Sequence, residues 1–100
     1  MNPRVSICCS VLNQAVLLAD MITNLREQVF KDWELVLVDD GSTEDISAVV
    51  KSFDDPRIKL HFFPENRGVP HGMNYAMEHA TGEYIGLLST DERLDANKLL

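Results

Sequence analysis

The feature that most limits the fold of this chain is an alternation of short apolar runs with longer segments of helical periodicity. The apolar runs read RVSICCSVL from Arg4, ELVLV from Glu34, RIKLHFF from Arg57 and EYIGLL from Glu83. The first two are apolar at nearly every position, which is typical of strands covered on both faces. Strands that alternate with helices form a parallel sheet with right-handed crossovers. The order therefore predicts an α/β fold with helices on both faces of the sheet.

Three segments between the apolar runs have the spacing of helices. They are residues 14–30, 43–53 and 71–80. We expect Asn13 to cap the first helix and Ser42 or Thr43 to cap the second, because short polar side chains accept hydrogen bonds from the first turn. Gly82 stands where a left-handed residue would end the third helix.

The size and charge of the chain exclude several classes of protein. At 100 residues it is one domain at most. The formal net charge of −7 argues against DNA or RNA as the main partner, because nucleic-acid binding needs a basic surface. No apolar run approaches the roughly 20 residues of a membrane span, so we expect no membrane segment here.

The two cysteines, Cys8 and Cys9, are adjacent within an apolar run. Neighbouring side chains of a strand point to opposite faces, so the two thiols cannot easily form a bridge. We expect two buried core thiols. The absence of a disulfide framework or a metal-binding spacing favours a reducing compartment, and hence a cytoplasmic location.

Polar segments follow each of the four predicted strands. They are residues 10–13, 39–42, 65–68 and 89–92. In parallel α/β sheets, ligands bind beyond the carboxyl ends of the strands. We therefore expect these segments to share one edge of the sheet, where Asp39, Asp40 and Asp91 would face a common cavity.

Read in order, these segments resemble the N-terminal half of a family 2 glycosyltransferase, an inverting enzyme of the GT-A type that uses a nucleotide-activated sugar. The resemblance rests on VSICCSVLN, ELVLVDDGST, DDPRIKLHFFPENRGVPHGMNYAMEHATGEYI and LLSTDERLDANKLL, and covers essentially the whole chain. It implies a three-layer Rossmann-like parallel sheet of about four strands in the order 3-2-1-4. It also implies that residues 1–100 are the nucleotide-sugar-binding half of a GT-A domain, truncated at the C-terminus.

The resemblance suggests roles for five residues that would bind the nucleotide sugar. Asp39 or Asp40 would accept a hydrogen bond from the base or ribose, with Asp40 the second choice because it could instead cap a helix. A carboxylate suits an N–H of a uracil-like base because it only accepts. Arg67 is the candidate for a diphosphate contact, and Asn13 and Asn74 match polar positions of the family. The alternatives are a pair of helix-capping acids without a ligand, and Arg67 as a surface residue.

The stretch LLSTDE stands where the family carries a D-x-D motif that holds Mn²⁺ or Mg²⁺ against the donor diphosphate. Ser89 replaces the first aspartate, and Thr90 fills the middle place. Asp91 and Glu92 match the acidic end of the motif, so Asp91 is the expected direct metal ligand, with Glu92 beside it. The loss of the first carboxylate would remove one interaction with the sugar or the metal, and Ser89 stays among the residues expected to bind the nucleotide sugar.

The resemblance implies that the full-length parent transfers a sugar from a nucleotide-diphospho-sugar, most simply a UDP-sugar, to a glycan, lipid or other acceptor. The parent would act in polysaccharide assembly at the cytoplasmic face of the membrane. Its general base would come from beyond Leu100, so the fragment alone would be inactive. The alternative is a degenerate, non-catalytic domain that binds nucleotide or another protein, which the Ser89 replacement would mark.

Two other α/β classes fit the order of elements less well. A dinucleotide-binding oxidoreductase needs G-x-G-x-x-G after its first strand, and this chain has SVLNQA there. A flavodoxin-like receiver domain would place its acidic pair after the first strand, whereas this chain places it after the second.

Overall fold

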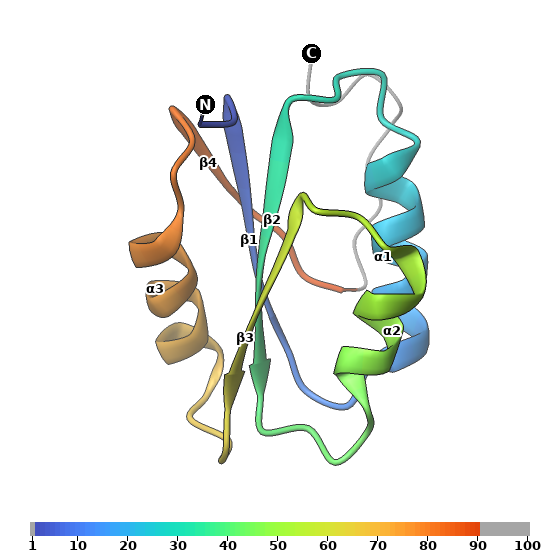
Figure 1. The fold of residues 1–100 in the computed structure, drawn as a ribbon. Coiled ribbons are helices and arrows are strands. Elements are labelled where there is room, and N and C mark those ends of the chain that lie inside the picture. The colour runs from blue at the N-terminus through green and yellow to red at the C-terminus, as the bar shows by residue number, and fades with distance from the viewer. Residues whose placement is uncertain (1, 91–100) are drawn as a thin grey trace.

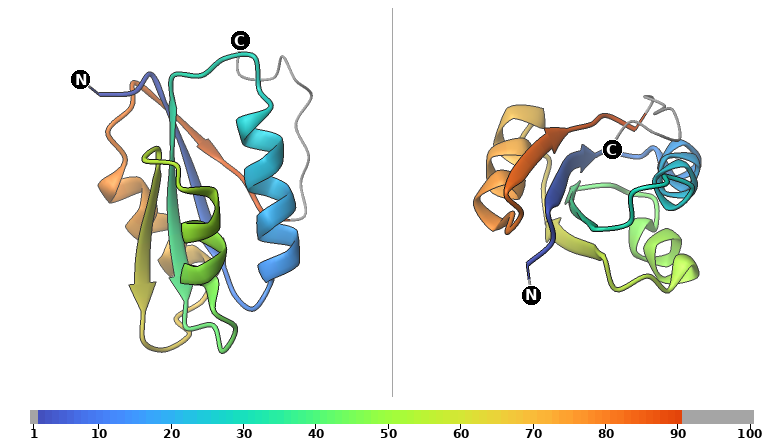
Figure 2. Two further views of the ribbon diagram at one scale, coloured as in Figure 1. Left: turned by 45° about the vertical axis from the view of Figure 1, so that its right-hand side comes forward. Right: turned by 90° about the horizontal axis from the view of Figure 1, so that it is seen from above.

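A computed structural model describes residues 2–90 of the chain. A four-stranded sheet with all pairs parallel has the order β3-β2-β1-β4, with α3 on one face and α1 and α2 on the other (Figures 1 and 2). The strands are β1 Val5–Val11, β2 Trp33–Asp40, β3 Ile58–Phe63 and β4 Tyr84–Leu87; the helices are α1 Ala15–Arg26, α2 Ile46–Phe53 and α3 Val69–His79. The predicted three-layer α/β fold and strand order 3-2-1-4 are confirmed. No helix between residues 2 and 90 combines the length and apolarity needed to cross a bilayer.

The two faces of the sheet bury separate cores. β2 is buried at every position, as expected of a central strand in a three-layer fold. One core lies between the sheet and the helices α1 and α2, and the other lies under α3. Leu35 and Leu37 belong to the first core, whereas Val36 and Val38 belong to the second. This alternation decides which way every side chain at the end of β2 points.

Neither cysteine is in a disulfide, and both are fully buried, as the sequence predicted. Cys8 lies in the core under α3, and Cys9 lies in the core under α1 and α2. Burial raises the pKa of the Cys8 thiol to about 11, and the nearby Glu34 carboxylate adds to the increase. The Cys8 thiol is therefore protonated near neutral pH, and both cysteines serve as packing groups of the core.

The starts of α1 and α2 differ from the predictions. Gln14, not Asn13, precedes the first residue of α1, and the Gln14 side chain makes no capping hydrogen bond to the helix. α2 begins at Ile46, and the Oδ1 atom of Asp45 accepts from the backbone N–H of Ala48, so Ser42 and Thr43 are not the caps. Both predictions failed because Asn13, Ser42 and Thr43 make contacts between two loops, described below. α1 also ends earlier than expected, at Arg26.

α3 begins earlier than predicted, at Val69, because Pro70 fits the first turn of a helix, where no N–H partner is needed. Gly82 does not have a left-handed backbone, so its role as a helix terminator was wrong. A Cβ atom at Gly82 would lie 2.8 Å from the backbone nitrogen of Ser6. Gly82 is therefore required for the close approach of this turn to β1.

Glu34 is a buried carboxylate that joins β1, β2 and the connection from α3 to β4. Its Oε2 atom accepts from the Ser6 hydroxyl at 2.6 Å, and from the backbone N–H and hydroxyl of Thr81 at 2.8 and 3.0 Å. The Ser6 oxygen in turn accepts from the N–H of Gly82 at 2.8 Å. This network anchors the chain at the amino end of the sheet.

The rings of the histidines His61 and His79 pack against one another and against Tyr75. The His61 ring on β3 lies 5.2 Å from the ring of Tyr75 and 4.7 Å from that of His79, measured between centroids. Burial lowers the pKa of His61, and the neighbouring His79 lowers it further. These rings fasten α3 to the edge strand β3.

Candidate functional site

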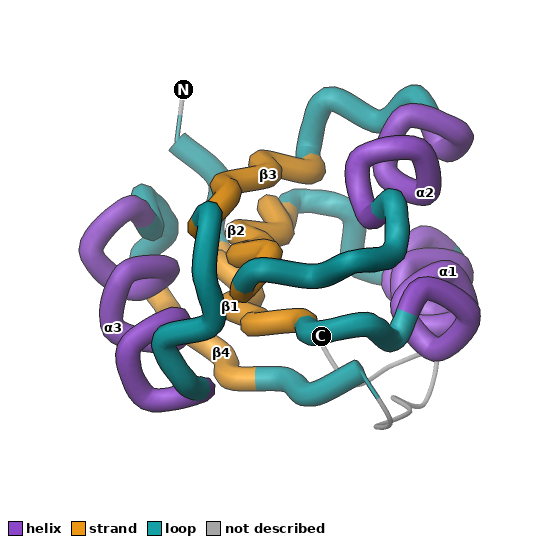
Figure 3. Tube along the Cα trace, turned by 90° about the horizontal axis from the view of Figure 1, so that it is seen from below, coloured by secondary structure: helices purple, strands orange, loops and turns teal. Residues whose placement is uncertain are grey.

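The loops that follow the four strands gather at the carboxyl end of the sheet, which Figure 3 views directly. They are residues 12–14, 41–45, 64–68 and 88–90. Side-chain oxygens of Asn13, Gln14 and Asp40 accept hydrogen bonds from neighbouring loops, two from backbone N–H groups and one from the Thr90 hydroxyl, so the loops form one continuous surface. The prediction that these segments share an edge is confirmed for residues up to Thr90. Asp91 and Glu92 lie outside the described residues.

Asp39 lies at the carboxyl end of β2 and is 4% exposed. It is paired in register with Val11 of β1, which belongs to the core under α1 and α2, so its side chain projects on that side of the sheet. Its Oδ1 atom accepts from the backbone N–H of Ser42 at 3.0 Å. Oδ2 makes no hydrogen bond to the described residues, so this oxygen keeps its capacity to accept.

Asp40 is 2% exposed and projects on the opposite side, toward α3. Its Oδ1 accepts from the backbone N–H of Arg67 at 2.7 Å, and its Oδ2 accepts from that of Gly68 at 3.0 Å. Asp40 therefore holds the loop before α3 and caps no helix at α2. Adjacent residues of a strand alternate between faces, so the expectation that Asp39 and Asp40 face one cavity was wrong, although both lie at the same edge.

Asn13 connects the loop after β1 to the loop after β2. Its Oδ1 atom accepts from the backbone N–H groups of Thr43 and Glu44, at 2.8 and 2.9 Å, and from the Thr43 hydroxyl at 3.1 Å. In the other direction, the backbone N–H of Asn13 donates to the Ser42 hydroxyl oxygen, and that of Ala15 donates to the Glu44 carboxylate, both at 2.9 Å. We call these contacts the loop clip.

Arg67 lies in the loop before α3, at the carboxyl edge of the sheet, whereas Asn74 lies within α3, farther from that edge. The guanidinium of Arg67 lies 4.9 Å from the centroid of the buried Phe63 ring, so the cation is placed over the end of β3. Asn74 is exposed in the second turn of α3. It is two residues from both Gly72 and Ala76, which are buried against the sheet, and so lies about 200° around the helix from them. The loop surface therefore includes Arg67 but not Asn74.

The segment after β4 joins the same surface. The backbone N–H of Leu88 donates to the carbonyl of Cys8 at 3.1 Å, which continues the pairing of β4 with β1. The hydroxyl of Thr90 donates to the side-chain oxygen of Gln14 at 2.6 Å, and Thr90 is buried. Ser89, exposed between them, lies at the carboxyl edge as predicted.

A metal site is not formed by the described residues alone. No group of three histidine, cysteine, aspartate or glutamate side chains within residues 2–90 is arranged to hold a metal ion. Asp39 and Asp40 point to opposite faces and accept backbone N–H bonds, so they do not converge on a cation. The acidic residues that the sequence predicts as metal ligands, Asp91 and Glu92, are both in the part of the chain beyond Thr90.

Two glycines that the sequence analysis did not select allow close contacts near this edge, Gly41 between two loops and Gly72 between α3 and β1. A Cβ atom at Gly41 would lie 2.6 Å from the backbone nitrogen of Asn66, and the φ angle of Gly41 is +76°. A Cβ atom at Gly72 would lie 2.5 Å from the Oγ atom of Ser10. Gly41 was detectable as the glycine of the Asp-Gly pair after a strand, whereas nothing in the sequence marks Gly72.

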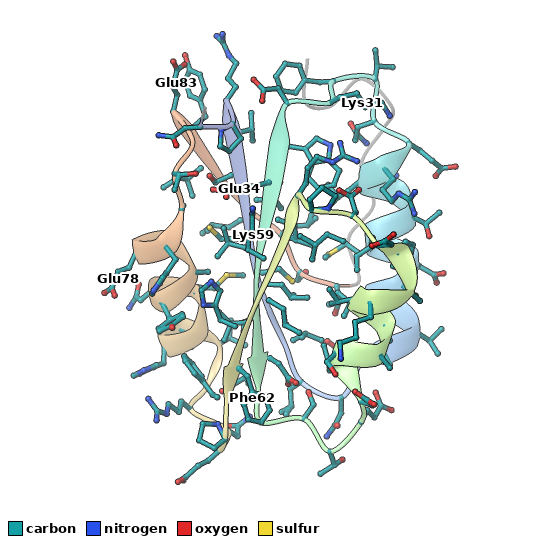
Figure 4. All side chains as sticks on the ribbon, in the orientation of Figure 1. Lys31, Glu34, Lys59, Phe62, Glu78 and Glu83 are labelled. Carbon is teal, nitrogen blue, oxygen red and sulfur yellow. The ribbon has the colours of Figure 1, made fainter. Side chains whose placement is uncertain are left out.

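Three depressions of about 250, 520 and 350 Å³ line the opposite, amino end of the sheet. The walls of the first two include Glu34 and Lys59, which Figure 4 places above Phe62, toward the amino end of the sheet. The Glu34 carboxylate there is already hydrogen-bonded to protein groups. Parallel sheets bind ligands at the carboxyl end, where backbone N–H groups at helix starts are available, so we place the candidate site there.

Comparison with known proteins identifies relatives along nearly the whole chain. Residues 6–100 match the family model of Glycosyl transferase family 2. The GalNAc(5)-diNAcBac-PP-undecaprenol beta-1,3-glucosyltransferase of Campylobacter jejuni is 34% identical over 92% of this chain and 31% of the relative. The UDP-Glc:alpha-D-GlcNAc-diphosphoundecaprenol beta-1,3-glucosyltransferase WfgD of Escherichia coli is 33% identical over 95% of this chain and 38% of the relative.

Among solved structures, the mannosyltransferase PcManGT from Pyrobaculum calidifontis, in complex with GDP-Man and Mn²⁺, superposes with a TM-score of 0.84. It is 30% identical in sequence and is matched over 96% of this chain and 30% of its own. The chain spans between 11% and 40% of the length of the curated relatives it matches.

Proposed function

The chain belongs to glycosyl transferase family 2, and on that premise we propose that it is the donor-binding part of an inverting glycosyltransferase that takes its sugar from a nucleoside diphosphate. The observation that carries this proposal is the fused loop surface at the carboxyl end of the sheet, with the Asp39 carboxylate and the Arg67 cation on it. Residues 1–100 would form the N-terminal half of the GT-A domain.

In this proposal each residue at the edge acts through a different group. Asp39 accepts, at its unbonded Oδ2, a hydrogen bond from the base or ribose of the nucleotide. Arg67 donates to the diphosphate, and Ser89 offers its hydroxyl to the donor. Asp40 shapes the site by holding the backbone of Arg67 and Gly68. Asn74 is a weaker candidate because it is exposed on the flank of α3.

A divalent cation completes the proposed donor site. The support is the relative PcManGT, whose complex contains Mn²⁺ together with GDP-Man. In this chain Asp91 would be the direct ligand, with Glu92 beside it, since oxygen ligands suit Mn²⁺ and Mg²⁺. When bound, such a cation neutralises the diphosphate and stabilises its departure. Ser89 replaces one carboxylate of the family motif, so we expect a weaker metal site than the motif with two aspartates would give.

The acceptor and the location of the parent protein are part of the same proposal. Two relatives are named for undecaprenol-linked acceptors, and one of these is named for UDP-Glc. We therefore propose a UDP-sugar donor and a lipid-linked or glycan acceptor, used at the cytoplasmic face of the membrane. The general base that deprotonates the acceptor would come from a segment after Leu100.

The replacement at Ser89 favours a second candidate, a degenerate domain that binds nucleotide weakly or serves only as a protein-binding module. The two candidates differ in one measurable property. A donor-binding domain binds a nucleoside diphosphate tightly when the cation is present, whereas a degenerate domain binds it only weakly, and a protein-binding module does not bind it, with or without the cation.

Calorimetric titration with UDP in the presence of Mn²⁺ tests the proposal. We expect UDP to bind in the presence of Mn²⁺ and not in its absence. The substitution Asp39→Asn should weaken this binding about tenfold or more, because the new amide N–H cannot accept a hydrogen bond from the base. Asp91→Ala should abolish the effect of Mn²⁺. Glu78→Ala on the outer side of α3 makes the same charge change away from the site and should leave the affinity unaltered (Figure 4). An equal affinity of Asp39→Asn and the unsubstituted protein for UDP would contradict the role of Asp39.

A further inference from the structure

We infer that Asn13 is a positioning residue of the donor site, which orders the loop after β2 and, through Ser42, orients the Asp39 carboxylate. This inference rests on the proposed function of the carboxyl edge and deepens it. It assigns the side-chain oxygen and the backbone N–H of Asn13 to the support of the site.

The first step is the number of hydrogen bonds that the Asn13 side-chain oxygen accepts. Its Oδ1 atom accepts from three donors on two residues, the N–H and hydroxyl of Thr43 and the N–H of Glu44. Two of these donors are backbone N–H groups, which cannot accept, so the atom that faces them is the oxygen and not the amide nitrogen. A carbonyl oxygen has two lone pairs, and three donors leave it no capacity for a sugar hydroxyl or ribose.

The second step is a chain of hydrogen bonds that leads from Asn13 to Asp39. The backbone N–H of Asn13 donates to the hydroxyl oxygen of Ser42 at 2.9 Å. The backbone N–H of Ser42 donates to Oδ1 of Asp39 at 3.0 Å. Ser42 is therefore held from both sides, and the orientation of the Asp39 carboxylate depends on the position of Ser42. The second oxygen of Asp39 is the one that the proposed function assigns to the nucleotide.

The third step is the backbone conformation at residue 13. Asn13 has a φ angle of +53°, in the left-handed region that most residues avoid. Asparagine and aspartate tolerate this region better than other residues with a side chain, and both carry an oxygen that accepts at short range. Glycine tolerates the conformation but has no acceptor. The position thus requires two properties that only these two residue types combine.

These properties define a set of variants for titration with UDP and Mn²⁺. Asn13→Gly keeps the left-handed backbone but removes the acceptor, and we expect its affinity to fall about tenfold. Asn13→Asp keeps both properties and should bind within about threefold of the unsubstituted protein. Asp54→Gly is the matched control, because Asp54 has a φ angle of +49° at the C-terminal end of α2. It should leave the affinity unchanged.

A double-mutant cycle separates positioning from a general loss of stability. If Asn13 acts through Asp39, then Asn13→Gly should add no further weakening once Asp39→Asn is present. Full additivity of the two substitutions would overturn the inference. So would an Asn13→Asp variant that binds as weakly as Asn13→Gly, because the acceptor oxygen would then be irrelevant.

Amide hydrogen exchange in the absence of nucleotide keeps this inference distinct from the proposed function. We expect Asn13→Gly to accelerate exchange at the backbone amides of Thr43 and Glu44, and Asn13→Asp to preserve their protection. Failure of the unsubstituted protein to bind UDP would refute the proposed function together with the role of Asn13 in it. Unchanged exchange in Asn13→Gly, with UDP still bound by the unsubstituted protein, would refute only the inference about Asn13.

Discussion

Replacing Gly41 with alanine is expected to lower the free energy of unfolding by about 3 kcal/mol, which combines a strained left-handed backbone with an overpacked contact. A Cβ atom at this position would lie 2.6 Å from the backbone of both Glu65 and Asn66. Backbone atoms cannot rotate away as the end of a side chain can, so the loops after β2 and β3 would have to separate. Denaturant unfolding of the variant measures the loss.

Two further variants identify the cause of that loss. Gly41→Asn tolerates the φ angle of +76° but still introduces a Cβ atom, so we expect it to be nearly as unstable as Gly41→Ala. Gly86→Ala is the control, because its Cβ atom would lie 3.4 Å from the flexible end of the Ile7 side chain. Its effect should stay within about 0.5 kcal/mol. Recovery of stability in Gly41→Asn would mean that the two loops are not in close contact.

The second large loss of stability is expected on substitution of Glu34, which lies at the end of the sheet opposite the candidate site. Glu34→Ala removes the acceptor for the Ser6 hydroxyl and for both donors of Thr81. The buried Ser6 hydroxyl left without its acceptor, together with the loss of two bonds from the exposed Thr81 to a charged group, costs about 3 kcal/mol. We expect thermal or denaturant unfolding to report this loss, without a change in the affinity of the opposite edge for nucleotide.

The pH dependence of stability gives Glu34 a sharper signature. Burial raises the pKa of this carboxyl, but hydrogen bonds from Ser6 and Thr81 and the positive charge of Lys59 outweigh burial, so the pKa lies below its ordinary value. The stabilisation is therefore present above the pKa of the unfolded chain and is lost as the pH falls through the lower pKa of the folded protein. Glu34→Gln, which keeps one acceptor oxygen, should lose about 1 kcal/mol at neutral pH and lack this dependence. If the stability of Glu34→Gln depended on pH in the same way as that of the unsubstituted protein, this role of the Glu34 carboxylate would be contradicted.

The fold could be predicted from the sequence because each element carries its own periodicity. The uniformly apolar β2, for example, requires cover on both faces, which fixes the three layers. Helix starts were less predictable, because Ser42, Thr43 and Asp45 are all suitable caps and only tertiary contacts decide among them. Ser42 and Thr43 form hydrogen bonds with Asn13, and Asp45 caps the helix.

The location of the site could also be predicted, but the direction of its side chains was misjudged. Asp39 and Asp40 were expected to face one cavity, although the two-residue period of a strand already implies opposite faces. The bonds of Asp40 to Arg67 and Gly68 join residues about thirty positions apart, and no local pattern encodes them. The hydrogen bonds of the loop clip likewise join residues far apart in the sequence, so no local pattern predicts them.

Chemical-shift mapping with UDP and Mg²⁺ tests the central claim most directly, because it locates the bound nucleotide on the protein. We expect the largest changes at the backbone amides of Ser42, Thr43, Arg67 and Gly68, around the carboxyl end of the sheet seen in Figure 3. Changes centred instead on Glu34, Lys59 and Thr81, at the amino end, would contradict the assignment of the donor site.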